Sequence, residues 1–291
     1  MKGAALINGH IVDIQQPVID MLDRGYMFGD GIYEVTPFFN GKCFGLIPHI
    51  ERLFYSLKET QIPAVYTMEE LVEFHELLIE KSDFKDGAIY LQVTRGSSAE
   101  RTHYFPDQVV PCLTMHSFPL NLEAIQKRKL EGVKAITYPD IRWMRCDIKS
   151  LNLLGAAMAK QKAHEADAYE AILYRENGVV TECSSSNFMV VKDGVIWTHP
   201  KNNYILNGIN RRIVMERLMQ ECEVTIVEKT FDMDFVKNAQ EAFATSSSCM
   251  IMPIVNIDGK PVGDGNVGEV TKKLIAGFDR FLQQECYSKN G

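Results

Sequence analysis

Turn signals divide the apolar positions of this chain into short segments. Asn8-Gly9 and Asn40-Gly41 lie between apolar or β-branched residues, and Asp193-Gly194 and Asp258-Gly259 are dipeptides of the same type. Such pairs favour two-residue β-hairpin turns, because both central residues tolerate positive φ. We therefore expect a hairpin at each of these places.

Two helices are expected after the second turn. The first is predicted to be short, and its apolar stripe is Ile50, Leu53, Phe54 and Leu57. Arg52 lies off this stripe and is available for another contact. The second helix should span about 68–81, because Thr67 precedes Glu70 by three residues, which is a capping box.

The remaining pattern predicts two domains. Apolar runs predict strands over 88–94, 109–118, 132–138, 169–174, 188–192, 224–227 and 242–245. Helical spacing predicts helices over about 151–165, 209–222 and 267–284. Between Pro119 and Lys129 the chain is polar and poor in strand formers, so we place a linker there. The expected fold has a smaller α+β domain over 1–119 and a larger α/β domain over 120–291.

Composition is that of an ordinary globular protein. The 291 residues are 46% hydrophobic and 24% charged, which suffices for two buried cores. A net charge of −7 and a pI near 5.6 argue against a nucleic-acid or anionic-membrane surface. The stretch 1–10 turns polar before a secretory core forms, and no run of about 18 apolar residues follows. We expect a cytoplasmic protein.

The cysteines give no sign of a metal or redox site. There are seven, widely spaced and without a Cys-x-x-Cys pair: Cys43, Cys112, Cys146, Cys183, Cys222, Cys249 and Cys286. We expect them to be reduced and mostly to serve as small packing residues, and we predict no metal site. Cys146 and Cys183 lie near the two segments described next, which leaves reactivity as an alternative for them.

Two segments carry candidate chemistry. Lys149 lies among small and apolar residues just before a predicted helix, and Glu182 precedes the hydroxyls of residues 184–186. An enclosed pocket lowers the pKa of a lysine, and a neutral lysine amine can form a Schiff base. A carboxylate that faces the ring nitrogen of pyridoxal phosphate keeps this nitrogen protonated. Taken singly, each residue reads as an ordinary surface group, and taken together they indicate a cofactor site.

A phosphate seat is expected where backbone N–H groups converge. Gly208 lies in a turn that opens a predicted helix at Ile209, whose positive end suits an anion. The hydroxyls of 245–248 and the Arg52 guanidinium are further donors. The alternatives are a plain polar turn and a solvated helix face.

Three motifs carry a family resemblance. They are Asp-Ile-Lys-Ser-Leu-Asn at 147–152, Thr-Glu-Cys-Ser-Ser-Ser-Asn at 181–187 and Asp-Arg-Gly-Tyr-Met-Phe-Gly-Asp-Gly-Ile-Tyr-Glu-Val at 23–35. In this order they resemble the class IV pyridoxal-phosphate-dependent aminotransferases, of fold type IV. The likeness runs from the first hairpin to the last helix, and it is greatest to the members that act on D-amino acids.

The resemblance implies a role for particular residues. It implies Lys149 as the Schiff-base lysine and catalytic residue, with the cofactor, pyridoxal 5'-phosphate, at the domain interface. The implied cofactor contacts are Glu182 at the ring nitrogen, Leu206 against the ring, and Arg52, Ile209, Asn210, Ser246 and Ser247 around the phosphate. The family usually has threonine where this chain has Asn210 and Ser247.

Substrate choice is predicted to depend on the segment 95–106. It resembles the loop that grips the substrate carboxylate in the D-specific members, which implies Arg101, His103 and the Tyr33 hydroxyl as substrate contacts. Relative to that pattern the chain has one extra residue, near Glu100. The alternative for His103 is a loop histidine that titrates in solvent.

The implied reaction is ping-pong transfer of an amino group. D-alanine is the expected donor and 2-oxoglutarate the expected acceptor, in an enzyme expected to be a homodimer. Rival hypotheses are a branched-chain or amine aminotransferase, a lyase of the same fold such as aminodeoxychorismate lyase, and a cofactor-binding protein without turnover.

Overall fold

The chain divides into two compact units in a computed structural model, which describes residues 3–15 and 19–288. Met1 and Lys2, the start of the N-terminal stretch considered above, lie outside the described residues. Unit 1 comprises 1–120, 148–152 and 284–291, and unit 2 comprises 121–147 and 153–283. The first boundary lies beside the expected one. The segment 148–152, however, joins unit 1 instead of the larger domain, because its backbone pairs with a strand of unit 1 and Ile148 packs in that core.

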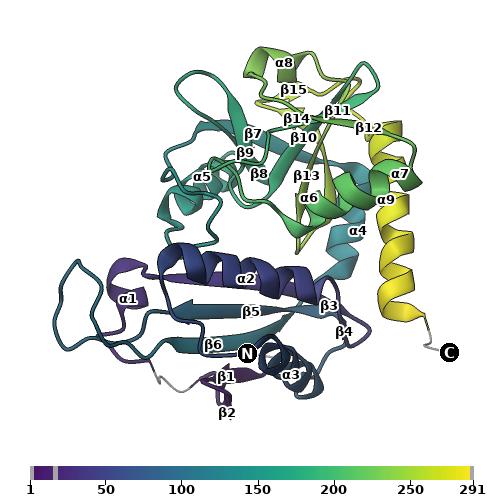
Figure 1. Ribbon diagram of the computed structural model, residues 1–291. Helices are drawn as coiled ribbons and strands as arrows, with labels where there is room; N and C mark the ends of the chain where they lie inside the picture. Colours follow the sequence, from purple (N-terminus) through teal and green to yellow (C-terminus); the bar gives the residue numbers. More distant parts are fainter. Residues whose placement is uncertain (1–2, 16–18, 289–291) are drawn as a thin grey trace. The chain divides into compact units, whose positions relative to one another are not determined.

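Unit 1 contains an antiparallel sheet covered by two helices. Its elements are β1 (Ala5–Ile7), β2 (His10–Val12), α1 (Arg24–Phe28), β3 (Gly31–Phe39), β4 (Lys42–Cys43), α2 (Leu46–Thr60), α3 (Met68–Glu80), β5 (Gly87–Thr94) and β6 (Cys112–Pro119). In the described part of this unit the six-stranded sheet has the order β2-β1-β6-β5-β3-β4. Figure 1 shows α2 lying along β3 and β5, with α3 beside β1.

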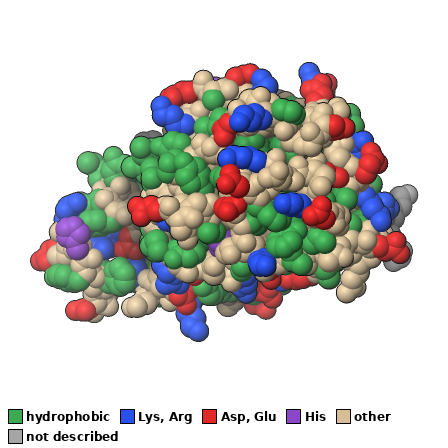
Figure 2. Space-filling model, turned by 90° about the horizontal axis from the view of Figure 1, so that it is seen from above, with side chains coloured by type: hydrophobic (Ala, Val, Ile, Leu, Met, Phe, Trp, Pro, Cys, Tyr) green, Lys and Arg blue, Asp and Glu red, His purple; other side chains and the backbone are tan. Residues whose placement is uncertain are grey.

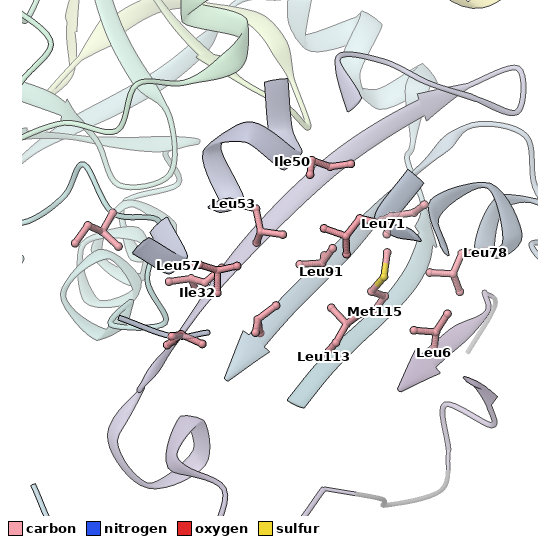
Figure 3. Close-up of a cluster of buried hydrophobic side chains, with 14 of the residues drawn as sticks. Leu6, Ile32, Ile50, Leu53, Leu57, Leu71, Leu78, Leu91, Leu113 and Met115 are labelled. Atoms are coloured by element: carbon pink, nitrogen blue, oxygen red, sulfur yellow. The ribbon is translucent and has the colours of Figure 1, made fainter. Parts of the chain in front are cut away.

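The core of unit 1 lies between these helices and one face of the sheet. Leu53 of α2 and Leu71 of α3 contact a cluster that includes Ile32, Leu91 and Met115 of the strands (Figure 3). Because strand side chains alternate between faces, the intervening residues such as Tyr90 and Gln92 lie on the opposite, half-buried face. Tyr33 of β3 is on that second face as well, since it pairs with Gln92.

Unit 2 contains a mixed sheet. Its elements are α4 (Leu122–Glu131), β7 (Val133–Pro139), α5 (Leu154–Glu165), β8 (Glu170–Tyr174), β9 (Val180–Cys183), β10 (Asn187–Lys192), β11 (Val195–Thr198), α6 (Ile209–Ile213), η1 (Val214–Leu218), α7 (Met219–Glu221), β12 (Thr225–Glu228), α8 (Met233–Lys237), β13 (Glu241–Ser246), β14 (Met250–Ile257), β15 (Lys260–Pro261) and α9 (Glu269–Leu282). The next element, η2 (Gln283–Tyr287), begins at the last residue of unit 2 and otherwise belongs to unit 1. The order of the nine strands in the described residues is β12-β11-β10-β13-β14-β7-β8-β9, and β15 pairs with β14. Ala159 and Ala163 of α5 pack on Ala171 and Leu173 of β8, where small side chains permit close approach.

All the predicted hairpin turns are present. Asn or Asp and the following Gly both have positive φ at Asn8 (46°) and Gly9 (85°), Asn40 (51°) and Gly41 (75°), Asp193 (53°) and Gly194 (75°), and Asp258 (50°) and Gly259 (77°). This is the combination that a type I′ turn requires. The turns join β1 to β2, β3 to β4, β10 to β11 and β14 to β15.

Two expectations about helices were wrong and one was confirmed. The capping box of α3 is present, with Thr67 and Glu70 bonded reciprocally. Helix α2 is not short, since it spans 15 residues. The polar stretch expected to be a linker forms α4, because Asn121 caps it and Lys129 buries its stem while its amine meets Asp279 at 3.1 Å.

The surface agrees with a chain of mixed charge. On the face seen in Figure 2, Lys and Arg side chains alternate with Asp and Glu side chains and form no single basic area. Of the helices within 3–15 and 19–288, none combines the length and apolarity needed to cross a bilayer.

The buried His75 predicts a pH-dependent stability. Its Nδ1 donates to the Leu71 carbonyl at 2.6 Å, and burial lowers the pKa of His75 to about 4. His75 therefore binds a proton more tightly in the unfolded chain than in the folded one. Its contribution to the free energy of unfolding is complete above pH 6.5 and is lost as the pH falls toward 4. The free energy of unfolding, measured with urea, should fall between pH 7 and pH 5 in the wild type. In His75→Gln this fall should be smaller by roughly 2 kcal/mol. Equal losses in both proteins would contradict this assignment.

Candidate active site

Lys149 is held at the edge of the unit 1 sheet. The Tyr33 N–H donates to the Lys149 carbonyl at 2.9 Å and the Leu151 N–H donates to the Gly31 carbonyl at 3.0 Å, so the segment pairs with the start of β3. The Lys149 amine lies 4.2 Å from the centroid of the Tyr33 ring. Two predicted site residues, one for the cofactor and one for the substrate, are thus brought together.

Helix α2 presents a second, polar stripe to the same region. His49, Arg52 and Ser56 recur at helical spacing, and His49 and Ser56 are fully buried. The Ser56 hydroxyl accepts from the Lys149 N–H at 3.4 Å. Arg52 makes a bidentate pair with Glu34 of β3, with Nε–Oε1 at 2.7 Å and Nη2–Oε2 at 2.8 Å. Arg52 is therefore not on a solvated helix face.

Glu34 joins these groups electrostatically. His49 Nδ1 donates to Glu34 Oε2 at 2.7 Å, on the carboxylate that Arg52 grips. Burial alone would raise the pKa of Glu34, but the Arg52 charge and hydrogen bonds outweigh it and hold this pKa far below its usual range. Burial lowers the pKa of His49, and the charges of Arg52 and Lys149 lower it further against the opposing effect of Glu34. The imidazole is thus held neutral beside the lysine segment.

Glu182 lies in a separate network in unit 2. Arg142 Nη1 donates to Glu182 Oε1 at 2.6 Å, and Asn187 Nδ2 donates to Oε2 at 2.8 Å. The Leu206 N–H reaches both oxygens at 3.2 to 3.3 Å. The other edge of Arg142 grips Asp140 at 2.9 Å. The carboxylate is therefore fixed in one orientation.

The electrostatics of Glu182 suit a cationic partner. Burial raises the pKa of Glu182, and the charge and hydrogen bond of Arg142 oppose this rise. The carboxylate accepts from Arg142, Asn187 and the Leu206 N–H, and the last donor is shared between both oxygens. A buried carboxylate of this kind is a chemically suitable partner for a protonated ring nitrogen.

The expected phosphate seat is assembled from two elements. Asn210, in the first turn of α6, donates from Nδ2 to the Ser246 carbonyl at the end of β13 at 2.6 Å. This amide therefore links helix to hairpin, while Ile209 is buried beside it. Gly208 permits the arrangement, because a Cβ there would lie 2.1 Å from Asn187 Oδ1. Ser247 follows Ser246 in the same turn.

One orphaned hydroxyl indicates that an acceptor belongs near this turn. Thr245 directly precedes Ser246 in the chain. Its buried Oγ1 has no hydrogen-bond partner within the described residues. A buried donor without a partner costs about 1–3 kcal/mol. Hydroxyl and backbone donors at a helix start are the set that a phosphate requires, so the residues fit the phosphate of the expected cofactor.

The three hydroxyls after Glu182 serve another purpose than expected. Ser184, Ser185 and Ser186 donate to the buried carboxylate of Glu170, the last two at 2.8 and 3.0 Å. They are therefore occupied with fixing the turn between Glu182 and Asn187 and are not part of a cofactor cradle. The sequence interpretation missed this because Glu170 lies on another strand.

Arg101 and His103 lie on one aromatic ring in unit 1. The Arg101 guanidinium carbon is 4.8 Å from the Phe28 centroid, and the His103 ring is 5.5 Å from it. Both side chains are exposed. The Glu100 carbonyl accepts from the Ser98 hydroxyl and from the Thr102 N–H, so the extra residue is accommodated in a local turn.

The fold and these sites define a family. The family model of class IV amino-transferases matches residues 31–257. The chain belongs to this family. It is a pyridoxal-phosphate-dependent transaminase.

Curated relatives cover nearly the whole chain. It is 44% identical over 278 residues to "D-alanine aminotransferase" of Staphylococcus aureus (strain COL), covering 95% of this chain and 97% of the relative. It is 41% identical over 281 residues to the protein of the same name from Listeria monocytogenes serotype 1/2a (strain 10403S), covering 97% and 96%.

Solved structures show the same fold. The branched-chain amino acid aminotransferase of Escherichia coli matches with a TM-score of 0.91 at 23% identity, over 100% of this chain and 98% of the other. A second branched-chain amino acid aminotransferase, from T.th. and complexed with N-(5'-phosphopyridoxyl)-L-glutamate, matches with a TM-score of 0.89 at 24% identity, over 98% and 95%. At this identity the likeness concerns the fold alone.

Several supporting residues escaped the sequence interpretation. They are Glu34, His49, Asp140, Arg142 and Asn187. Glu34 was within a recognised motif and Arg52 was already singled out, so a search for an acid facing that arginine would have found it. Arg142 gave no local signal, since its partner Glu182 is 40 residues away.

Removal of Arg142 should reveal the cost of a buried Glu182. Arg142→Gln leaves the carboxylate without its cation, which should lower the free energy of unfolding by about 3–5 kcal/mol at pH 7. In this variant the pKa of Glu182 is higher in the folded than in the unfolded chain. The loss in free energy of unfolding caused by the substitution should therefore shrink as the pH falls to 5. Urea unfolding at the two pH values measures both effects.

The control is Arg212→Gln, which breaks an exposed ion pair to Glu216 at 3.3 Å. This change should cost less than about 1 kcal/mol at either pH. If the two variants behaved alike, the Arg142–Glu182 pair would not be the support described.

Proposed function

We propose that this enzyme transfers the amino group of a D-amino acid, with D-alanine as the preferred donor, to a 2-oxo acid such as 2-oxoglutarate. The observation that carries the proposal is the fixed Lys149 amine beside Tyr33, on the unit that also bears Arg101 and His103. Relatives named "D-alanine aminotransferase", at 41% and 44% identity, support the choice of substrate.

The proposal keeps the cofactor contacts that the family resemblance implies. Arg52, Ile209, Asn210, Ser246 and Ser247 hold the phosphate. Leu206 would hold the ring by apolar contact, and Glu182 would keep the ring nitrogen protonated. Glu34 and His49 support Arg52 from behind, because a bidentate carboxylate fixes the guanidinium plane.

Lys149 is both anchor and proton carrier in this proposal. When bound, the cofactor supplies an electron sink for electrons released at the substrate Cα. Lys149 Nζ would take the proton from the substrate Cα and hold it for return in the second part of the half-reaction. Backbone pairing to β3 keeps the lysine Cα fixed, so only the side chain moves. Glu182 holds the proton on the ring nitrogen throughout.

Substrate orientation is assigned to three side chains. Arg101 supplies a guanidinium fork to the carboxylate, and His103 and the Tyr33 hydroxyl supply further donors. Fixing the carboxylate on one side decides which hydrogen of Cα faces Lys149, and this geometry favours the D enantiomer. The product of the first half-reaction is a 2-oxo acid, and a second 2-oxo acid then reverses the sequence.

We further propose a homodimer in the cytoplasm. Large apolar side chains are strongly exposed on the isolated chain, including Tyr26 (80%) and Val110 (81%) in unit 1 and Leu154 (75%) in unit 2. A single chain gains by covering such groups, and a second copy is the simplest partner.

The direct test is the absorption of the reconstituted protein before and after each alanine enantiomer. The band of the lysine-bound cofactor should disappear with D-alanine and persist with L-alanine over the same time. A response to L-leucine alone would favour the branched-chain alternative. Pyruvate release without an acceptor would favour a lyase.

Lys149→Ala should remove turnover, with a loss of about 10⁴-fold or more, because both the anchor and the base are absent. The lysine-specific absorption band should be absent from this variant. The matched control is Lys162→Ala, an exposed lysine paired with Glu165 at 2.7 Å, which should leave both unchanged. Full activity of Lys149→Ala would remove this residue from the mechanism.

A further inference from the structure

Two fully buried arginines converge on one carboxylate in unit 1. Arg24 and Arg95 are each 2% exposed, and each donates from Nε to Asp30 Oδ2 at 2.8 Å. Arg95 also donates from Nη2 to Asp30 Oδ1 at 3.0 Å. Two like charges can share a buried site only with a counter-ion between them, so Asp30 holds the cluster together.

The cluster is attached to the loop that carries the proposed substrate contacts. Arg24 Nη1 donates to the Thr102 carbonyl at 2.8 Å, and Thr102 lies between Arg101 and His103. The Arg95 guanidinium carbon lies 3.6 Å from the centroid of Phe105, further along the loop. Both arms of the cluster therefore end on the loop.

Phe28 extends this attachment to the two substrate side chains. The Arg24 guanidinium carbon is 4.7 Å from the Phe28 centroid, and Arg101 and His103 pack on the same ring at 4.8 and 5.5 Å. A guanidinium stacked on a ring fixes the position of the side chain more than it binds it tightly.

Other support for the loop is limited. The loop closes where Gly96 meets Val110, so closely that a Cβ at Gly96 would lie 2.0 Å from the Val110 carbonyl oxygen. Gly96, Ser97 and residues 107–110 line a cavity of about 730 Å³ instead of packed side chains. Tyr104 is 69% exposed. Backbone hydrogen bonds hold the start of the loop, from the Arg24 N–H to the Gly96 carbonyl at 2.9 Å and from the Ser98 N–H to the Leu22 carbonyl at 3.4 Å. Further along, the Arg24 guanidinium ties the Thr102 carbonyl to the buried part of the unit.

We propose that Asp30 is a positioning residue that sets substrate affinity and enantiomer preference through Arg24, Arg95 and the 101–105 loop. This inference rests on the proposed function, because it concerns how Arg101 and His103 are held. Arg95 is anchored at the other end by the Thr60 and Gln61 carbonyls at 2.7 and 2.8 Å.

Asp30→Asn tests the inference, because asparagine keeps the shape and removes the charge. In this variant KM for D-alanine should rise about tenfold or more with a smaller change in kcat, and the ratio of D- to L-alanine rates should fall by a similar factor. Tryptic cleavage after Arg101 should be faster, while cleavage elsewhere is unchanged. Asp83→Asn, at an exposed position of the same unit, is the control and should change none of these.

A second variant covers the case in which Asp30→Asn does not fold. Phe105→Leu removes only the ring under Arg95, at a position that is 47% exposed, and should raise KM about fivefold in the same direction. If the wild type shows no response to D-alanine, the proposed function fails. If the wild type responds but folded Asp30→Asn, or Phe105→Leu in its place, keeps the wild-type KM and enantiomer ratio, the positioning role of Asp30 fails.

Discussion

The pairing of residues 149–151 with the start of β3 is the constraint on which the rest depends. Two backbone hydrogen bonds, from Tyr33 to Lys149 and from Leu151 to Gly31, make a segment distant in sequence part of the unit 1 sheet. This pairing brings the Lys149 amine to the Tyr33 ring and the Lys149 N–H to Ser56 of α2. A lysine on a flexible loop would have no defined distance to any of them. Because sheet and helix share one apolar core, the position of the Lys149 Cα is as stable as that core.

Two of the charged groups proposed to bind the cofactor are each held by a group of opposite charge. Arg52 is gripped by Glu34, and Glu182 is gripped by Arg142. Such pairs contribute little net stability, because desolvation offsets their attraction. What they provide is orientation, since a bidentate contact fixes the plane of a guanidinium or carboxylate. The Asp30 cluster follows the same rule on the substrate side.

Much of the fold could be predicted because its signals are local. A dipeptide such as Asn8-Gly9 determines a turn through its own φ angles, and the capping box of Thr67 and Glu70 lies within three residues. Composition alone wrongly predicted a linker where α4 forms. This helix is stabilised by a contact that is distant in sequence, because Lys129 buries its aliphatic stem and its amine donates to Asp279. Lys149 and Glu182 could be singled out as candidates through their motifs. Arg142, Glu170 and Asp30 were not assigned roles, because a residue that acts through a partner far along the chain leaves no pattern near itself.

The measurement that tests the central claim most directly is the site of covalent attachment of the cofactor. The protein is reconstituted with pyridoxal phosphate, reduced with borohydride, digested with trypsin and mapped by mass spectrometry. We expect one modified peptide, spanning 146–160 with cleavage blocked at Lys149. Modification of a different lysine in place of Lys149, or an unmodified 146–149 peptide in a fully loaded protein, would contradict it.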